Sequence, residues 1–133
     1  MQLIEKIVVA FYKKATTDVL IGYHFRKIQE SPSTEPLYPE LHHFSEHIPR
    51  IVTFWKQQLN LLENDVKPTN FDILNVHRRL NIRKGELNRW VLLFKQTLEE
   101  QNKKELTEEE VIVVEKMEDK VNHFEQVFLK QLF

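Results

Sequence analysis

Apolar residues recur at helical intervals along most of the chain, and this spacing limits the fold more than any other feature of the sequence. Near the start, the steps between apolar residues are three, one, three and four, which places Ile4, Ile7, Val8, Phe11 and Ala15 on one helical face. Similar stripes return after residues 47, 87 and 107. Tight hairpins favour glycine, and the chain has only two glycines. We therefore predict an all-α fold.

The starts of two helices are indicated by the residues that flank their stripes. Pro49 fits a helix only in its first turn, so one helix should begin near Glu46 or His47. Thr107 and Glu110 have the spacing of a capping box, which predicts the start of the last helix. The residues expected to face inward from the last three long helices are Ile51, Phe54, Trp55, Leu59 and Leu62; Leu87, Trp90, Val91, Phe94 and Leu98; and Val114, Met117, Val121, Phe124 and Phe128.

Two segments interrupt the helical pattern. Residues 31–36 are rich in proline and serine and should form an exposed connection, and residues 64–70 form a second break. After the second break, Phe71, Leu74 and His77 recur at intervals of three, which predicts a short helical element. His77 should therefore share a face with apolar residues.

Length and composition set the broad class of protein. The 133 residues suit one domain, residues 1–133. A formal charge of −1 gives no basic footprint for nucleic acid or an anionic membrane. The chain has no cysteine, so histidines and carboxylates are the only strong metal ligands. The first residues lack a signal-peptide pattern and no apolar run reaches the roughly 20 residues of a membrane span, so we expect a cytoplasmic protein.

His47 and His77 most suggest a cofactor, because each accompanies an apolar helical face and the two imidazoles could face each other across a flat molecule. A lone histidine on such a face is more often a packed core residue, and that interpretation stays open. Haem iron needs one neutral nitrogen ligand and leaves its other side for a gas or an oxidant, which suits His77. Tyr12 and Trp90 carry an O–H and an N–H that could donate hydrogen bonds to that gas. This pattern indicates a haem site.

The other histidines are expected at the surface, namely His24, His42, His43 and His123. His43 and His47 have the spacing of a zinc-binding pair, but the proline that follows argues against a regular helix across them. Arg78 and Arg79 stand beside the candidate iron ligand, either to pair with haem propionates or as an exposed charged face. The sequence contains no phosphate-binding loop, nucleophile elbow or paired carboxylates, which leaves no basis for a hydrolase or a kinase.

Several blocks, taken in order over roughly residues 4–124, resemble the truncated haemoglobins of group III. The blocks are Phe11-Tyr12-Lys13-Lys14, residues 18–25, His47-Ile48-Pro49-Arg50-Ile51-Val52-Thr53-Phe54-Trp55 and Asn88-Arg89-Trp90-Val91-Leu92-Leu93-Phe94. Between the last two blocks, His77 is the only histidine at the proximal position. The near absence of glycine also fits group III, which lacks the glycine-pair motifs of the other groups. Each block is moderately specific, and their order and spacing together are more so.

The resemblance implies a fold, a cofactor and a set of roles. The fold is globin-like, a shortened two-over-two helical sandwich, and the cofactor is haem. The implied roles are iron ligation by His77, haem contacts by Phe25, His47, Ile51, Phe54 and Trp90, hydrogen bonding around the bound gas by Tyr12, His47 and Trp90, and closure of the distal side by Trp55. Two features depart from the family: residues 31–39 look like an insertion that would rearrange the wall near His47, and the residues around His77 match poorly.

These observations predict a haem protein that reversibly binds dioxygen or another diatomic ligand at iron. Two hydrogen bonds of about 1.5–3 kcal/mol each would slow oxygen release roughly a hundredfold or more, which suits redox or detoxification chemistry better than bulk transport. A nitric oxide dioxygenase-like or peroxidase-like oxidoreductase would also need an electron donor, which the sequence does not identify. With peroxide, His47 would act as the acid–base group and Arg50 as a charge stabiliser. The alternatives are a haem-free globin-fold module for sensing or protein binding, and a plain helical bundle whose aromatic residues are only core.

Overall fold

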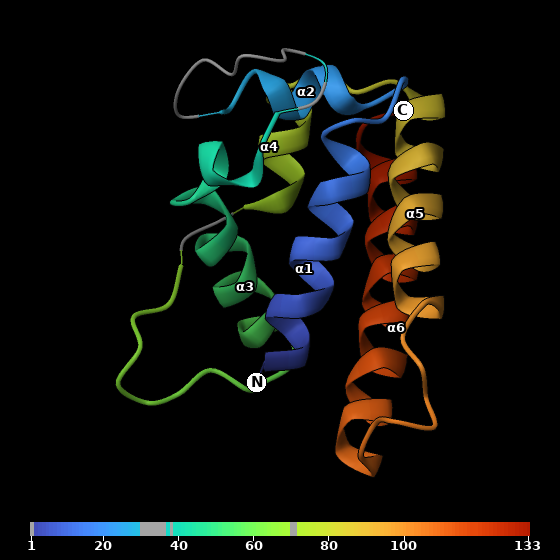
Figure 1. The fold of residues 1–133 in the computed structure, drawn as a ribbon. Coiled ribbons are helices and arrows are strands. Elements are labelled where there is room, and N and C mark those ends of the chain that lie inside the picture. Colours follow the sequence, from blue (N-terminus) through green and yellow to red (C-terminus); the bar gives the residue numbers. More distant parts are fainter. Residues whose placement is uncertain (1, 30–36, 38, 70–71) are drawn as a thin grey trace.

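The computed structural model of the chain describes residues 2–29, 37, 39–69 and 72–133, and all the regular structure in these residues is helical (Figure 1). The elements are α1 (Gln2–Ala15), α2 (Gly22–Arg26), the 3₁₀ helix η1 (Leu41–Phe44), α3 (His47–Gln58), α4 (Ile73–Arg79), α5 (Lys84–Glu99) and α6 (Glu108–Gln131). The prediction of an all-α fold is confirmed.

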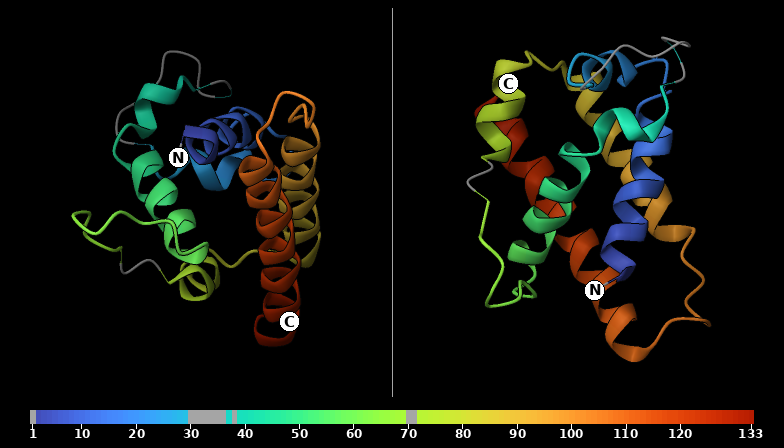
Figure 2. Two further views of the ribbon diagram at one scale, coloured as in Figure 1. Left: turned by 90° about the horizontal axis from the view of Figure 1, so that it is seen from below. Right: turned by 60° about the vertical axis from the view of Figure 1, so that its left-hand side comes forward.

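The four long helices form two stacked pairs. Helix α1 packs against α3 on one side and against α5 on the other, and α5 packs against α6. Figure 1 and the left-hand view of Figure 2 show α5 and α6 side by side, and Figure 1 shows the short helices α2 and α4 toward one end of α1. This arrangement is the globin-like, shortened two-over-two sandwich expected from the sequence.

The long helices turn their predicted stripes into the core. All five stripe residues of α1 and all five of α6 are buried, and in α5 four are buried while Trp90 is partly buried. The pairs meet at aromatic rings: Phe94 of α5 lies 5.1 Å from Phe11 of α1 and stacks on Trp55 of α3 at 5.2 Å between ring centroids. The core therefore joins α1, α3 and α5 around one aromatic centre.

Two predicted helix starts are confirmed, and one predicted stripe ends early. Helix α3 begins at His47 with Pro49 in its first turn. The Thr107 hydroxyl accepts a hydrogen bond from the Glu110 N–H at 3.1 Å, and the Glu110 carboxylate accepts one from the Thr107 N–H at 3.0 Å, as in a capping box. Helix α3 ends at Gln58, because the chain reaches a φ of 58° at Asn60, a conformation that asparagine tolerates. Leu62 therefore lies beyond the helix.

The turn between α1 and α2 is fixed to α5 by a carboxylate. Asp18 accepts hydrogen bonds from the N–H groups of Leu20 and Ile21 at 3.0 and 3.2 Å. Its other oxygen accepts from Arg89 of α5, at 2.9 Å from Nε and 2.8 Å from Nη2. This network sets the start of α2 and hence the position of Phe25.

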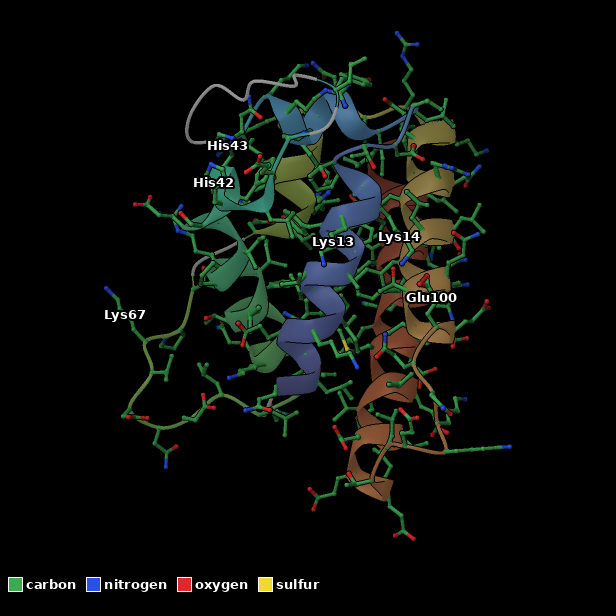
Figure 3. All side chains as sticks on the ribbon, viewed as in Figure 1. Lys13, Lys14, His42, His43, Lys67 and Glu100 are labelled. Atoms are coloured by element: carbon green, nitrogen blue, oxygen red, sulfur yellow. The ribbon has the colours of Figure 1, made fainter. Side chains whose placement is uncertain are left out.

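A second ion pair links α1 to the end of α5. Lys14 of α1 points toward α5, as Figure 3 shows, and its Nζ lies 2.5 Å from an oxygen of Glu100 and 3.3 Å from the Thr97 hydroxyl. Because both charged side chains are partly exposed, the pair contributes little to stability and mainly marks the contact between α1 and the end of α5.

Some predictions fall on residues that the structure does not describe. The predicted connection at residues 31–36 and Phe71 lie outside the described residues, and of the apparent insertion at residues 31–39 only Leu37 and Pro39 are described. Among the helices that are described, none has both the length and the apolar character needed to cross a membrane.

Candidate functional site

Helices α1 to α5 surround an apolar cavity of about 310 Å³. Ligand pockets typically span about 300–1,000 Å³, so this cavity lies at the small end of that range. Its wall includes all the residues that the resemblance assigned to haem, to a bound gas or to the distal side, namely Tyr12, Phe25, His47, Ile51, Phe54, Trp55, His77 and Trp90. Residues that are far apart in the sequence thus meet at one site.

His77 stands in this wall with one ring nitrogen held and the other available. Helix α4 starts at Ile73. The Asp72 side chain caps it by accepting a hydrogen bond from the Asn75 N–H at 3.1 Å. The His77 Nδ1 then lies 2.6 Å from the Ile73 carbonyl oxygen, one turn earlier. A carbonyl only accepts hydrogen bonds, so Nδ1 carries the proton and Nε2 keeps its lone pair. Histidine ligands of metals are usually oriented in this way.

The surroundings of His77 keep its imidazole neutral. Burial lowers the pKa of His77 more than the hydrogen bond to Ile73 raises it, and the nearby imidazole of His24 lowers it further. A neutral imidazole is the form that coordinates a metal. The lowered pKa and the tautomer of His77 therefore both favour coordination of a metal by its Nε2.

Trp90 lies beside His77. Its ring centroid is 5.9 Å from that of His77 and 6.2 Å from that of Phe128, on which it stacks. The ring of Phe128 is itself 5.1 Å from the imidazole of His77, and that of Phe11 is 6.4 Å from Trp90. The sequence placed Trp90 beside the bound gas, whereas these ring contacts place it beside the candidate iron ligand.

Tyr12 and His47 form a second polar group in the cavity wall. Tyr12 is 3% exposed, and its ring lies 5.7 Å from the imidazole of His47 and 5.3 Å from the ring of Phe25. Burial raises the pKa of Tyr12, so the phenol stays protonated at neutral pH and can donate its O–H. His47 is the first residue of α3 and is partly buried. The structure thus brings together two of the three residues expected around a gas.

The three arginines near the site differ in position. Arg79 lines the cavity although it is largely exposed, so it can reach a charged edge of an occupant. Arg78 is also exposed and donates to the Asn75 side chain at 3.1 Å. Arg50 is exposed and is not part of the cavity wall, so the structure does not bring this charge to the site.

Two histidines expected at the surface are buried, and this part of the prediction is wrong. His24 is 6% exposed and His43, at the outer edge of the fold in Figure 3, is 7% exposed. His42 and His123 are exposed, as predicted. A side chain cannot be placed from its own helix alone when a neighbouring element covers it, which explains both errors.

Sequence reasoning missed the pair formed by His24 and Glu86, both of which line the cavity. The Nε2 of His24 lies 3.0 Å from the Glu86 carboxylate, which also accepts hydrogen bonds from the Tyr23 hydroxyl and, at 2.8 Å, from the Arg83 N–H at the start of α5. The spacing of Arg83 and Glu86 was the one available signal, since it resembles a helix cap. Nothing in the sequence connects Glu86 with a histidine 62 positions earlier.

The donor set of the cavity suits a cofactor-bound metal better than a free ion. In the part of the chain that the structure describes, no three histidine or carboxylate side chains gather to hold a metal ion. A single available imidazole such as His77 fits a metal whose other ligands belong to a cofactor. Comparison of the chain with protein-family models, curated proteins and solved structures gave no match. The likeness to truncated haemoglobins therefore rests on the sequence blocks quoted above.

Proposed function

We propose that this protein binds haem in the cavity between α1 and α5, with the Nε2 of His77 as the iron ligand. The observation that carries the proposal is the 2.6 Å hydrogen bond from His77 Nδ1 to the Ile73 carbonyl oxygen. It fixes the ring and leaves a neutral nitrogen in the wall of an apolar cavity. When bound, haem would supply an iron centre that takes up dioxygen, nitric oxide or peroxide and exchanges electrons.

The chain's own groups would orient and stabilise a small diatomic ligand. The buried Tyr12 hydroxyl remains a donor at neutral pH, and His47 lies beside it. Hydrogen bonds to a charged acceptor contribute about 1.5–3 kcal/mol each. Firm retention of the ligand favours redox or detoxification chemistry, fed by an electron donor in the cytoplasm, over transport. Arg79 would pair with a propionate at the mouth of the cavity.

Haem would have to widen the cavity, because 310 Å³ is small for a macrocycle. Helix α4 is the element that can yield. It spans only residues Ile73–Arg79 and has no fully buried side chain. Short, weakly buried elements open at low cost compared with the core, so movement of α4 would enlarge the space beside His77 without breaking the α1, α3 and α5 contacts.

The test is hemin titration of the purified protein, followed by absorption spectra of the ferric, dithionite-reduced and carbon monoxide-bound forms. We expect one equivalent to bind with an intense Soret band that shifts on reduction and again with carbon monoxide. His77→Gly should lose the axial ligand, and added imidazole should restore the parent spectrum. His123→Gly, at an exposed histidine of α6, is the matched control. Unchanged ferric and ferrous spectra in His77→Gly would rule out the assigned ligand.

The gas-binding side has its own test. In the haem-loaded protein, Tyr12→Phe keeps the ring and removes the donor, so oxygen should dissociate about tenfold faster or more. Flash photolysis followed by ligand replacement measures this rate. An unchanged rate would show that the Tyr12 hydroxyl does not donate a hydrogen bond to the bound oxygen.

The second candidate is a haem-free sensing or binding module on the same fold. One observation favours it: the ring of His77 already packs against Trp90 and Phe128, as a core histidine would. A protein that stays colourless and refuses added hemin would support this candidate over the first.

A further inference from the structure

The cavity has a polar residue that the haem proposal does not use. His24 lies on α2 and is 6% exposed, and its ring forms part of the cavity wall. Its Nε2 is held by Glu86 at 3.0 Å, whereas its Nδ1 is buried without a hydrogen-bond partner among the described residues. A buried polar atom without a partner destabilises the fold unless something else satisfies it. His24 Nδ1 is therefore a position where a ligand would relieve a deficit.

The surroundings of Glu86 decide which ring nitrogen of His24 carries the proton. Burial alone would raise the pKa of Glu86, but hydrogen bonds from the Tyr23 hydroxyl, the Arg83 N–H and His24 lower it below its usual value. The carboxylate is thus ionised at neutral pH and only accepts hydrogen bonds. Nε2 therefore carries a proton, and in the neutral ring Nδ1 presents a lone pair. In that form His24, a residue of the cavity wall, offers one unsatisfied acceptor.

The wall around this acceptor is built from aromatic rings. Phe25 follows His24 on α2 and packs edge-on against Phe11 at 6.1 Å, and Phe11 packs against Phe94 at 5.1 Å. Aromatic guests gain edge-to-face contacts in such surroundings that aliphatic guests lack. One buried acceptor among aromatic rings favours a flat apolar ligand that carries one donor.

We infer that this cavity binds a small aromatic molecule with a hydroxyl group, whose O–H donates to His24 Nδ1. In the haem-free protein, this occupant would take the space that haem is proposed to fill. The inference does not depend on the haem function, because it uses α2 and the start of α5, whereas iron ligation uses α4. For the haem-free sensing module, the inference names the class of molecule that would be sensed, which is a small hydroxylated aromatic compound.

The experiment compares phenol with toluene, which has the same ring and lacks the donor, on haem-free protein by isothermal titration calorimetry. One buried hydrogen bond should make phenol bind about tenfold more tightly than toluene. In His24→Phe the ratio should fall to near one. His43→Phe removes a histidine that is equally buried but not part of the cavity wall, and should keep the preference. Equal affinities in the parent protein, or an unchanged ratio in His24→Phe, would overturn the inference.

Two further measurements protect the test against a variant that fails to fold. Glu86→Gln keeps an oxygen for the Arg83 N–H but offers an N–H to His24 Nε2, which should move the proton to Nδ1 and abolish the preference for phenol. In the unsubstituted protein, phenol but not toluene should shift the ¹⁵N resonance of His24 Nδ1. Phenol that binds without moving this resonance contradicts the inference. Hemin binding is scored separately from the Soret band, so either proposal can fail alone.

Discussion

Replacing Asp18 by asparagine should destabilise the protein more than any other single exchange of similar size at a polar position of the turn. The Asp18 side chain is 5% exposed, and it accepts from two backbone N–H groups and from two nitrogens of Arg89. Asparagine has nearly the same shape but only one acceptor oxygen. Its NH₂ group would point either at Arg89 or at the N–H groups of Leu20 and Ile21, and both contacts are repulsive.

The magnitude follows from the exposure of the two partners. Breaking a fully buried ion pair costs about 3–5 kcal/mol, but the Arg89 side chain is 33% exposed and can recover water, so the lower range applies. We expect a loss of about 2–3 kcal/mol in the free energy of unfolding. With a urea m-value of about 1–2 kcal/mol per molar for a chain of this size, the unfolding midpoint should drop by roughly 1–3 M.

The pH dependence identifies the charge as the cause. Burial alone would raise the pKa of Asp18, but the hydrogen bond and charge of Arg89 and the two backbone N–H groups hold it below its usual value. A carboxyl with a lowered pKa stabilises the fold above its unfolded value of about 3.9 and loses this contribution as pH falls through the folded value. The gap between parent and Asp18→Asn should therefore be full at pH 7 and close below about pH 3.9.

Urea unfolding followed by circular dichroism at pH 7, 5, 4, 3 and 2.5 measures this gap. Asp119→Asn, at an exposed aspartate of α6, is the control and should change stability by less than about 0.5 kcal/mol. A gap for Asp18→Asn that stays constant from pH 7 to 2.5 would show that shape rather than charge is responsible, and the account of this turn would be wrong.

Two further predictions concern the core and the glycines. Met117 is completely buried in α6, so Met117→Ala should lower the free energy of unfolding by about 2–4 kcal/mol. The control Glu118→Ala, at the neighbouring exposed position, should lower it by less than about 0.5 kcal/mol in the same thermal or urea unfolding experiment. Equal effects would contradict the assigned buried face of α6. Gly22→Ala should destabilise by about 1–2 kcal/mol, because the added carbon would lie 2.5 Å from the Arg26 guanidinium and 3.0 Å from a backbone oxygen. Gly85→Ala meets nothing within 4 Å and should stabilise α5 by about 0.5–1 kcal/mol, so effects of the same sign at both glycines would refute this reading.

The sequence was sufficient to predict the buried faces of the long helices, because these faces depend on the spacing of residues within each helix. The stripe of α1 and that of α6 repeat at the helical period, and burial of these residues follows directly from that repeat. The capping pair of Thr107 and Glu110 lies three residues apart, so the start of α6 was also readable. The early end of α3 was not, because it depends on the backbone conformation that Asn60 adopts.

The sequence predicted part of the cavity wall, and it predicted the arrangement of the wall residues less well. Aromatic and histidine residues on inward faces converge on one cavity, as expected for Tyr12 and His77. The neighbour of each ring was not predictable, because Trp90 could approach either side of the cavity from α5 and only the packing of Phe128 decides it. His24 and Glu86 remained hidden for the same reason: their pairing joins elements that local periodicity treats separately.

The two sides of the cavity differ in how firmly they are held, and this difference separates the two proposed occupants. Tyr12 is fixed in a core helix among packed rings, whereas His77 belongs to a seven-residue helix with no fully buried side chain. A ligand that binds only the folded state stabilises it by RT ln(1 + [L]/Kd), about 2.7 kcal/mol at a hundred times Kd. Hemin held by His77 would mainly stabilise α4, which is the least buried helix of the site. A phenol held by His24 would stabilise α2 and, through Glu86, the start of α5. The location of the stabilised helix therefore distinguishes the two occupants even where their total effect on stability is the same.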